Sequence, residues 1–540
     1  MRKMNLYHVF FVLILGIAGC KSGKDAVTEE QKEKHVNTFS CSPLVEQSDY
    51  SIYRLTEDAV RIGDVMPYFD SESGQFNIYY LKDIWNDATH RRHPWYCLKT
   101  SNFYTYTPLA AGEVLSCSTD PCNQDYAIGT GSVIKKNSTY YAFYTGHNPN
   151  YPSSCVTKKE GLMLGTSSSL NAAFTKNTGF ATIYPPEGYD QTDNFRDPYV
   201  IYDDATSKYY LILAARTQVN GVWKGVIPYY TSTDLLNWTY QGILYDGGLQ
   251  SFFMLETPEI FKIGSVYYLL FSDIDSKHVY YRKSSSITGP WSKPEGYDRF
   301  DGKGIYAAKT AMDNYGDRYI FGWTYVQEGN SDIGTPKWGG NLIAHKLYAK
   351  ANGDLAVAIP HTLKNYLEGQ SHSINKSSSR GNVTNTSTSA HTYTLSSQAS
   401  FDVANVVFDP VNLQRFKINC TVSYSASSKD FGFMIGACDG INDFYSLRFI
   451  PGQNRFSLDK VSRSQITEST IASTDVPFKL SPNVNYDVQI VIENSMLVVY
   501  INNEEALSTR IYKATNTTWG IFTDNSTATF GNITVTKPTN

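Results

Sequence analysis

Three acidic residues stand at the start of apolar segments that lie far apart in the chain. They are Asp64, which precedes Val-Met-Pro, Asp197 in Phe-Arg-Asp-Pro, and Glu256 in Leu-Glu-Thr-Pro. Carboxyl groups that converge in one cleft can cleave a glycosidic bond, because one protonates the leaving oxygen while another attacks the anomeric carbon or activates water. Crowded negative charge also separates their pKa values, so that one group keeps its proton near neutral pH. We therefore predict that these residues form a catalytic site.

Each of these residues also has a plainer interpretation. Gly-Asp is ordinary turn chemistry, so Asp64 alone would mark a turn. Arg196 and Asp197 would form a structural ion pair at the entrance of a strand. Glu259 competes with Glu256 for the role of the acid, but alternation along the strand turns Glu259 away from the axis. The occurrence of three acids in similar settings favours the catalytic interpretation.

Further residues are candidates for holding a sugar. Trp85, Trp323 and Trp338 present aromatic faces of the kind that stack on sugar rings, and Thr130 offers a hydroxyl. The plainer interpretation of each tryptophan is a core residue. We predict these four residues and Arg196 as the substrate-binding set.

These residues need a scaffold that brings distant segments together. An aromatic strand pattern recurs in the first two-thirds of the chain, at Phe76–Leu81, Tyr140–Tyr144, Tyr209–Leu213, Val266–Phe271 and Arg318–Trp323. Each follows an apolar strand across a polar turn, and several precede a third strand. This repetition predicts a five-bladed β-propeller. The first strand of each blade lies closest to the axis, so acids at equivalent positions of these strands would face one funnel.

A second domain follows the repeats. A tract rich in Ser, Asn and Thr between residues 371 and 389 predicts a connector. The alternating strands beyond it lack helical periodicity and predict a β-sandwich, with a hairpin formed by Tyr486–Ile492 and Met496–Ile501. The expected boundaries are a signal peptide at 1–19, a tether at 20–40, the propeller at 41–365, a linker at 366–390 and the sandwich at 391–540.

The composition agrees with an all-β fold and excludes several classes of protein. The 540 residues are 41% apolar, 14% aromatic and only 18% charged, which is too apolar for a disordered chain. Abundant Tyr and Phe favour strands over helices. A net charge of −4 leaves no basic field that would attract nucleic acid, so we expect no nucleic-acid partner.

The N-terminus resembles a bacterial lipoprotein signal peptide. Arg2 and Lys3 precede an apolar run from residue 6 to residue 19, which is short for a membrane span of about 20 residues, and Cys20 follows. The alternative is an ordinary signal peptide with an incidental cysteine. The lipoprotein pattern implies cleavage before Cys20, a lipid on its thiol, and an exported protein anchored to a bacterial membrane on its periplasmic or cell-surface side.

The chain has seven further cysteines, and the oxidising compartment expected for an exported protein would permit disulfides among them. Cys117 with Cys122, and Cys420 with Cys438, are local candidates for disulfides. The odd number leaves at least one cysteine free or paired elsewhere. No spacing of Cys or His fits a zinc finger, so no structural zinc is expected.

The segments around the three acids resemble glycoside hydrolase family 32, the fructan hydrolases and invertases. Phe195–Pro198 matches the Arg-Asp-Pro motif of that family, and Glu256–Phe261 (ETPEIF) is similar to its Glu-Cys-Pro motif. Gly129–Val133 (GTGSV) resembles its Ser-Gly-Ser segment. Trp338–Leu355 resembles the segment that closes blade five, and Val499–Tyr512 resembles a late strand pair of the sandwich. Five matches in the order of the family extend the resemblance over nearly the whole mature chain.

The resemblance implies a retaining hydrolase of β-fructosidic bonds in an oligo- or polysaccharide such as levan, inulin or sucrose. Asp64 is then the nucleophile that forms a fructosyl ester, and Glu256 is the general acid that later acts as the base. Asp197 is expected to hold fructose hydroxyls and to support the oxocarbenium-like transition state. Arg196 is expected to fix hydroxyls and to keep Asp197 ionised. No metal and no cofactor are expected.

The chain departs from the family pattern at several positions. The usual first motif is Asn-Asp-Pro-Asn-Gly, whereas Gly63 and Val65 flank Asp64 here. Leu81 stands where many members have Gln, and Thr257 replaces the usual Cys. Two alternatives therefore stay open. One is a relative of family 43 that hydrolyses arabinan or xylan with inversion, and the other is a non-catalytic glycan-binding lipoprotein.

Overall fold

The computed structural model describes residues 49–85, 91–387, 390–398, 403–437, 444–460, 474–512 and 518–539. The predicted signal peptide, the predicted lipid attachment site Cys20 and the predicted tether up to residue 40 lie outside these residues. Among the described residues, no helix has the length and apolar character needed to span a membrane.

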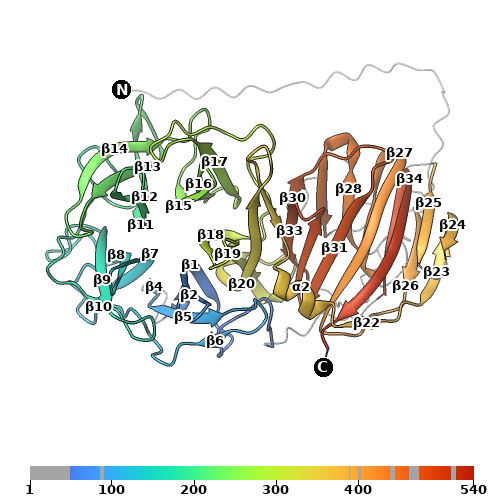
Figure 1. The fold of residues 1–540 in the computed structure, drawn as a ribbon, viewed down its shortest axis with the longest axis horizontal. Helices are drawn as coiled ribbons and strands as arrows, with labels where there is room; N and C mark the ends of the chain where they lie inside the picture. The colour runs from blue at the N-terminus through green and yellow to red at the C-terminus, as the bar shows by residue number, and fades with distance from the viewer. Residues whose placement is uncertain are drawn as a thin grey trace, which may run out of the picture. The chain divides into compact units, whose positions relative to one another are not determined.

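Five antiparallel blades surround a common axis in the N-terminal part of the chain (Figure 1), and blades one and five are joined into one continuous sheet. Blade one consists of β1 (Ile62–Asp70), β2 (Gln75–Lys82), β5 (Trp95–Thr100) and β6 (Thr107–Pro108). Blade two consists of β7 (Ala127–Lys136), β8 (Thr139–His147), β9 (Glu160–Ser167) and β10 (Thr175–Lys176). Blade three consists of β11 (Phe195–Asp203), β12 (Lys208–Val219), β13 (Val222–Ser232) and β14 (Thr239–Tyr245). Blade four consists of β15 (Leu255–Ile263), β16 (Val266–Asp273) and β17 (Val279–Ser284). Blade five consists of β18 (Tyr306–Met312), β19 (Arg318–Gln327), β20 (Pro336–Ala349) and β21 (Leu355–Ala358). The short strands β3 (Ile84–Trp85) and β4 (Arg91–Arg92) form a separate pair.

The innermost strands β1, β7, β11, β15 and β18 each contact the next one around the ring. The ring closes where β1 pairs with β20 of blade five, through Ile62 and Gly340. All five predicted aromatic strands lie inside the second strands of the blades. The prediction of a five-bladed propeller is therefore confirmed.

Every innermost strand carries a β-bulge near its start. In β11, Arg196 pairs with Ala214 and Tyr199 pairs with Ile212. Two residues of β11 therefore lie between these pairs where β12 has only one, which makes one extra residue in β11. The same single extra residue occurs in β1, β7, β15 and β18, at the register shifts 62/65, 128/131, 256/259 and 306/309. A bulge bends its strand and redirects side chains. The five bulges therefore decide which side chains face the axis.

The C-terminal part is a β-sandwich, as predicted. Its strands are β22 (Gln370–His372), β23 (Lys376–Arg380), β24 (Asn382–Ser387), β25 (Thr392–Ser396), β26 (Ala404–Phe408), β27 (Arg415–Ala437), β28 (Tyr445–Ile450), β29 (Arg455–Asp459), β30 (Thr474–Pro477), β31 (Tyr486–Glu493), β32 (Met496–Ile501), β33 (Glu505–Arg510) and β34 (Thr518–Lys537). The remaining elements are η1 (Glu328–Asn330), α2 (His361–Leu367) and η2 (Pro451–Gln453). The long strands β27 and β34 pair along most of their length, and register shifts interrupt the pairing between 424 and 430. The two strands pass from one layer to the other at these shifts, because the first half of β27 pairs with β31 and the second half with β28.

The predicted linker at 366–390 is wrong for most of its length. Residues 370–387 form β22, β23 and β24, which pair with β34, β26 and β25 of the sandwich. Runs of Ser, Thr and Asn resemble a loop in composition, but an edge strand with both faces exposed has the same composition. The short helix α2, between β21 of blade five and β22 of the sandwich, connects the two parts of the chain instead. The predicted hairpin of β31 and β32 is confirmed.

Buried polar groups join the propeller to the sandwich. Asp301, in the loop before β18, accepts hydrogen bonds from the amide and the hydroxyl of Ser508 in β33, at 2.7 and 2.6 Å. His345 of β20 lies 3.0 Å from the same carboxylate. Glu493 at the end of β31 accepts backbone amides of residues 51, 52 and 53, which lead into β1. The apolar core of blade five continues into β31 and β32 across this contact.

The disulfide arrangement differs from the expectation. Cys122 pairs with Cys155, and Cys97, Cys117 and Cys420 are free thiols. The predicted Cys117–Cys122 pair is therefore wrong. The predicted Cys420–Cys438 pair is also wrong because Cys420 is a free thiol, while Cys438 itself lies outside the described residues. Cys155 lies in a loop between β8 and β9, and spacing along the chain does not reveal that this loop folds back beside Cys122.

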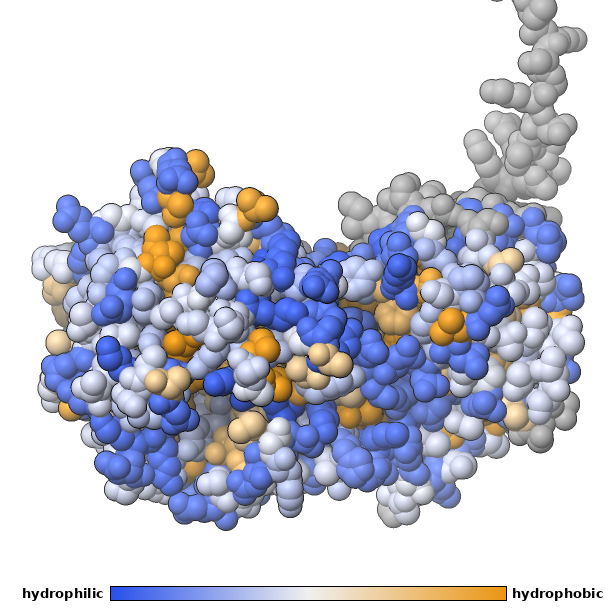
Figure 2. Space-filling view, turned by 45° about the horizontal axis from the view of Figure 1, so that its top comes forward, coloured by the Kyte–Doolittle hydropathy of each residue, from blue (hydrophilic) through white to orange (hydrophobic). Residues whose placement is uncertain are grey.

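On the face drawn in Figure 2, hydrophilic residues predominate and hydrophobic ones are scattered.

Candidate active site

A cavity of about 640 Å³ opens at the end of the axis where the innermost strands begin. Asp64 of blade one, Asp197 of blade three and Glu256 of blade four all line it. The prediction that three acids from distant segments converge is therefore confirmed by the placement of their side chains. The expectation that they occupy equivalent strand positions is wrong, because Glu256 precedes its bulge while Asp64 and Asp197 lie within theirs.

Both carboxylate oxygens of Asp64 accept hydrogen bonds. Thr130 donates to Oδ2 at 2.5 Å, and the indole Nε1 of Trp323 donates to Oδ1 at 3.0 Å. Gly63 precedes Asp64 because Trp338 packs on the backbone there, and a Cβ at position 63 would lie 2.0 Å from its ring. Burial raises the pKa of Asp64, and the Thr130 bond opposes that shift. The carboxylate is thus held in one orientation.

Asp197 is 3% exposed and lies in the left-handed region, with φ at 62°. Its amide donates to Thr145 Oγ1 at 2.9 Å, and its Oδ2 accepts the Thr257 amide at 2.9 Å. Thr257 adopts φ of 48° at the matching bulge of blade four. Non-glycine residues keep such conformations only where surrounding contacts hold them. Burial raises the pKa of Asp197, the neighbouring charge of Arg196 lowers it, and Glu256 raises it.

Glu256 accepts hydrogen bonds on both oxygens. Arg196 donates from Nη2 to Oε1 at 2.6 Å, and the hydroxyl of Tyr306 in β18 donates to Oε2. Arg196, Glu256 and Tyr306 stand at the same position on their strands, one residue before each bulge. Three neighbouring blades therefore form a continuous chain of hydrogen bonds along one wall of the cavity.

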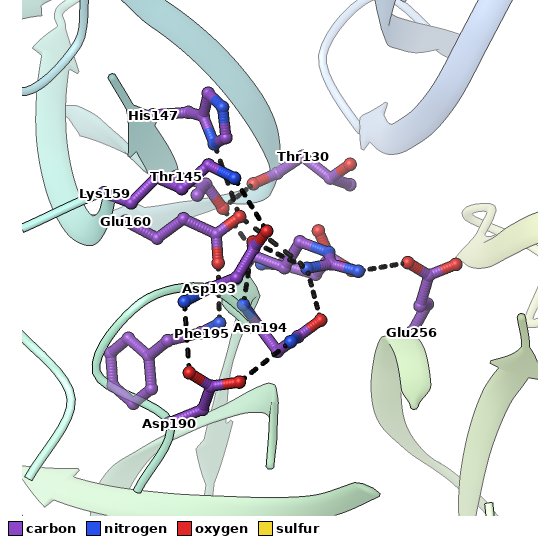
Figure 3. A network of polar contacts seen from close by, with 12 residues as sticks. Thr130, Thr145, His147, Lys159, Glu160, Asp190, Asp193, Asn194, Phe195 and Glu256 are labelled. Carbon is purple, nitrogen blue, oxygen red and sulfur yellow. Dashed lines mark hydrogen bonds and ion pairs between the residues drawn. The ribbon is translucent and has the colours of Figure 1, made fainter. Parts of the chain in front are cut away.

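Arg196 joins two carboxylates, those of Glu160 and Glu256, which are labelled in Figure 3. Besides Glu256 it faces Glu160 at the start of β9, with Nη1 3.6 Å from Oε1. Glu160 also accepts the Phe195 amide at 2.6 Å and lies 3.4 Å from His147 Nδ1. Burial would raise the pKa of Glu160, but Arg196 and His147 lower it well below its usual range. The predicted pairing of Arg196 with Asp197 is replaced by pairing with Glu256 and Glu160.

The other predicted site residues have separate outcomes. Thr130, Trp323 and Trp338 line the cavity, and Trp338 stacks on His93 with ring centroids 4.3 Å apart. Trp85 lies in β3, but its side chain is outside the described residues. Glu259, the competing acid, is fully buried and bonds to Thr310 instead of lining the cavity.

Two functional residues escaped the sequence analysis. Glu160 has no motif around it, since it opens the third strand of blade two and its position depends on the turn of that blade. Tyr306 opens the apolar strand β18 and has no motif around it either. Tyr306 occupies the same position as Arg196 and Glu256, one residue before the bulge of its strand. No residue type in the sequence marks where a bulge occurs.

Comparisons with known proteins identify the family and the fold of the chain. Residues 68–356 match the model of the glycosyl hydrolases family 32 N-terminal domain. Residues 353–537 match a second model, described as GH32, BT1760-like, C-terminal domain. Asp197 and Glu256 fall inside the first match, and Asp64 lies four residues before its start.

Individual relatives are distant. The chain is 24% identical to a sucrose-6-phosphate hydrolase of Staphylococcus xylosus over 344 residues, which cover 60% of this chain and 66% of that protein. It is 28% identical to a levanbiose-producing levanase of Bacillus subtilis over 225 residues, which cover 39% and 38% of the two chains. The alignments thus span about two thirds of the first relative and well under half of the second. A solved sucrose-6-phosphate hydrolase from Lactobacillus gasseri shares the fold, with a TM-score of 0.65 at 18% identity over 91% of this chain and 94% of that one.

The double role of Arg196 predicts a pH-dependent loss of stability in Arg196→Leu. The variant leaves Glu160 buried without its cation, so we expect a loss of about 2 kcal/mol in unfolding free energy at pH 7. Because the pKa of Glu160 is depressed in the folded protein, this stabilisation is present above the ordinary glutamate pKa of about 4.3 and disappears as the pH falls further. The difference between variant and wild type should therefore shrink towards pH 3 in denaturant titrations.

Lys159→Leu is the matched control for this measurement. Lys159 pairs with Asp193 at 2.7 Å beside the same site, but both side chains are partly exposed. Such pairs contribute less than about 1 kcal/mol. An equal loss in both variants, or a loss in Arg196→Leu that does not depend on pH, would contradict the buried role of the guanidinium.

Proposed function

Because the chain belongs to glycosyl hydrolase family 32, we propose that it hydrolyses β-fructosidic bonds of fructans or fructo-oligosaccharides with retention of configuration. One observation carries the proposal: a single cavity collects Asp64, Asp197 and Glu256, each held by hydrogen bonds from a neighbouring blade. The names of the relatives from Staphylococcus xylosus and Bacillus subtilis refer to fructose-containing saccharides, which agrees with this substrate class.

In the first step, Glu256 protonates the glycosidic oxygen and the carboxylate of Asp64 attacks the anomeric carbon of the fructosyl unit. The bond to the leaving sugar breaks and an ester forms on Asp64. In the free site both oxygens of Glu256 accept hydrogen bonds, from Arg196 and Tyr306. The protonated carboxyl of Glu256 has one O–H donor for the glycosidic oxygen and keeps acceptor capacity for these two groups. Thr130 and Trp323 keep the Asp64 carboxylate aimed at the sugar.

In the second step, Glu256 removes a proton from water, and the resulting hydroxide attacks the same carbon and releases Asp64. Asp197 does not form a bond to carbon. It holds fructose hydroxyls and stabilises the positive charge that develops on the ring in both transition states. The rings of Trp323 and Trp338 form apolar walls on which a sugar face can lie.

Two alternatives make different predictions. A family 43-like arabinan or xylan hydrolase would invert configuration, and the match of residues 353–537 to a family 32 domain argues against it. A non-catalytic glycan-binding protein would not need three acids in one cavity. Hydrolysis of levan, inulin or sucrose, hydrolysis of arabinan alone, and hydrolysis of none of them are the outcomes that separate these three possibilities.

The proposal predicts release of fructose or fructo-oligosaccharides by the full-length protein in detergent from levan, inulin or sucrose, and none from arabinan. Asp64→Asn should reduce this activity by at least about 10³-fold, because an amide cannot form the ester. Asp70→Asn is the control, since Asp70 lies at the other end of β1, away from the cavity. Activity on arabinan alone, or full activity in Asp64→Asn, would contradict the proposal.

We also propose that the protein is exported and held at a bacterial membrane by a lipid on Cys20. The signal-like segment from Arg2 to Gly19 supports this placement. Cys20→Ser should move the protein from the membrane fraction to the soluble fraction, as measured by immunoblotting of both. Retention of the variant in the membrane fraction would contradict the lipid anchor.

A further inference from the structure

Lys309 is a buried lysine directly beneath the candidate active site. It is 1% exposed and is the first residue after the bulge of β18 in blade five. Its Nζ donates to the carbonyl oxygen of Gly131 at 3.1 Å. Gly131 belongs to β7 of blade two, which is not adjacent to blade five, so this side chain spans the propeller axis.

Lys309 does not line the cavity that holds the three acids. It lines a second cavity of about 280 Å³ at the opposite end of the innermost strands, together with Tyr199 and Arg318. The lysine is therefore part of the floor between the two cavities. A group in this position cannot touch a substrate bound above it.

The acidic groups around Lys309 come from three other blades. Burial lowers the pKa of Lys309 to about 8, and the charges of Asp197 in β11, Glu259 in β15 and Asp64 in β1 oppose that shift. The ammonium group also lies 5.2 Å from the ring centre of Tyr199 in β11. Glu259 has partners of its own, because it accepts the amide and the hydroxyl of Thr310 at 2.6 Å and faces Arg318 of β19. Lys309 nevertheless lowers the pKa of Glu259, so its charge is shared among the carboxylates of Asp64, Asp197 and Glu259.

The contact with Gly131 has a second consequence. Gly131 directly follows Thr130, whose hydroxyl donates to Asp64. It must be glycine, because a Cβ there would lie 1.9 Å from the carbonyl oxygen of Phe143. The hydrogen bond from Lys309 therefore holds the backbone of the bulge that presents Thr130 to Asp64.

We propose that Lys309 is a positioning residue that acts across the propeller axis: its hydrogen bond to Gly131 fixes the bulge that presents Thr130 to Asp64, and its ammonium group supplies positive charge beneath the carboxylates of the site. This inference rests on the proposed function, because it concerns the carboxylates of that site. Arg196 neutralises Glu256 and Glu160 on one wall, and Lys309 provides the matching positive charge from below.

The test compares the pH profiles of kcat/KM for wild type, Lys309→Met and Lys309→Gln on the fructan that the wild type hydrolyses. Both variants lose the charge, and Gln keeps a hydrogen-bond donor. Removing a cation raises the pKa of nearby carboxyls, so we expect the acidic limb to move to higher pH by about one unit in both variants. Lys309→Met should also lower kcat more than Lys309→Gln does, because it loses the contact with Gly131.

Lys417→Met is the matched control. Lys417 is likewise fully buried, but it lies in β27 of the sandwich and pairs with Glu368. It should leave the acidic limb unchanged even if the melting temperature falls. An unmoved acidic limb in both Lys309 variants would overturn the inference, and so would failure of both to fold, which would assign Lys309 to structure alone. If the wild type released no fructose from any fructan, the proposed function itself would fail.

Discussion

The arrangement of the site depends on one backbone feature, the single extra residue near the start of every innermost strand. Side chains at matching places around these bulges contact one another across blades. Arg196, Glu256 and Tyr306 stand one residue before their bulges and form one hydrogen-bonded chain. Asp64 and Thr130 occupy the second residue of theirs and bond to each other. Lys309 follows its bulge and faces the opposite cavity. The side chains before, within and after the bulges thus lie at three successive levels along the axis. Strands with regular alternation and no bulge would not place them in this way.

Such bulges carry strain that the rest of the fold has to offset. Asp197, Thr257 and Ala307 all adopt left-handed backbone angles, each at a cost of about 1–3 kcal/mol. Hydrogen bonds from Asp197 to Thr145 and from Thr257 to Asp197 stabilise two of them. The sandwich contributes at a distance, because Glu493 binds the backbone that leads into β1 and so fixes the entry of the strand that carries Asp64. Catalytic geometry and domain packing are thus physically connected.

The sequence was sufficient to predict the five repeats, the sandwich and the three acids, because these depend on strand periodicity and on short motifs such as Phe195–Pro198. It could not reveal register. Glu160, Tyr306 and Lys309 carry no motif, and each acquires its role only from the strand across from it. The same limitation explains the errors. The Ser-rich segment that forms β22 to β24 looks like a linker until its pairing partners are known, and the Cys122–Cys155 disulfide depends on a loop that folds back. Arg196 was paired with its neighbour in sequence, whereas its partners are Glu256 and Glu160.

The central claim is that the bulge of β1 presents Asp64 as the nucleophile, with Glu256 as its acid and base. The most direct test traps the covalent intermediate. A fructosyl fluoride needs no proton donor to leave, so in Glu256→Ala the ester should form and then persist, since no base activates water. Rapid acid quenching, proteolysis and mass spectrometry should find one fructosyl unit on the peptide that contains Asp64. A fructosyl unit on another carboxylate, or release of product with inverted configuration and no adduct, would contradict the account.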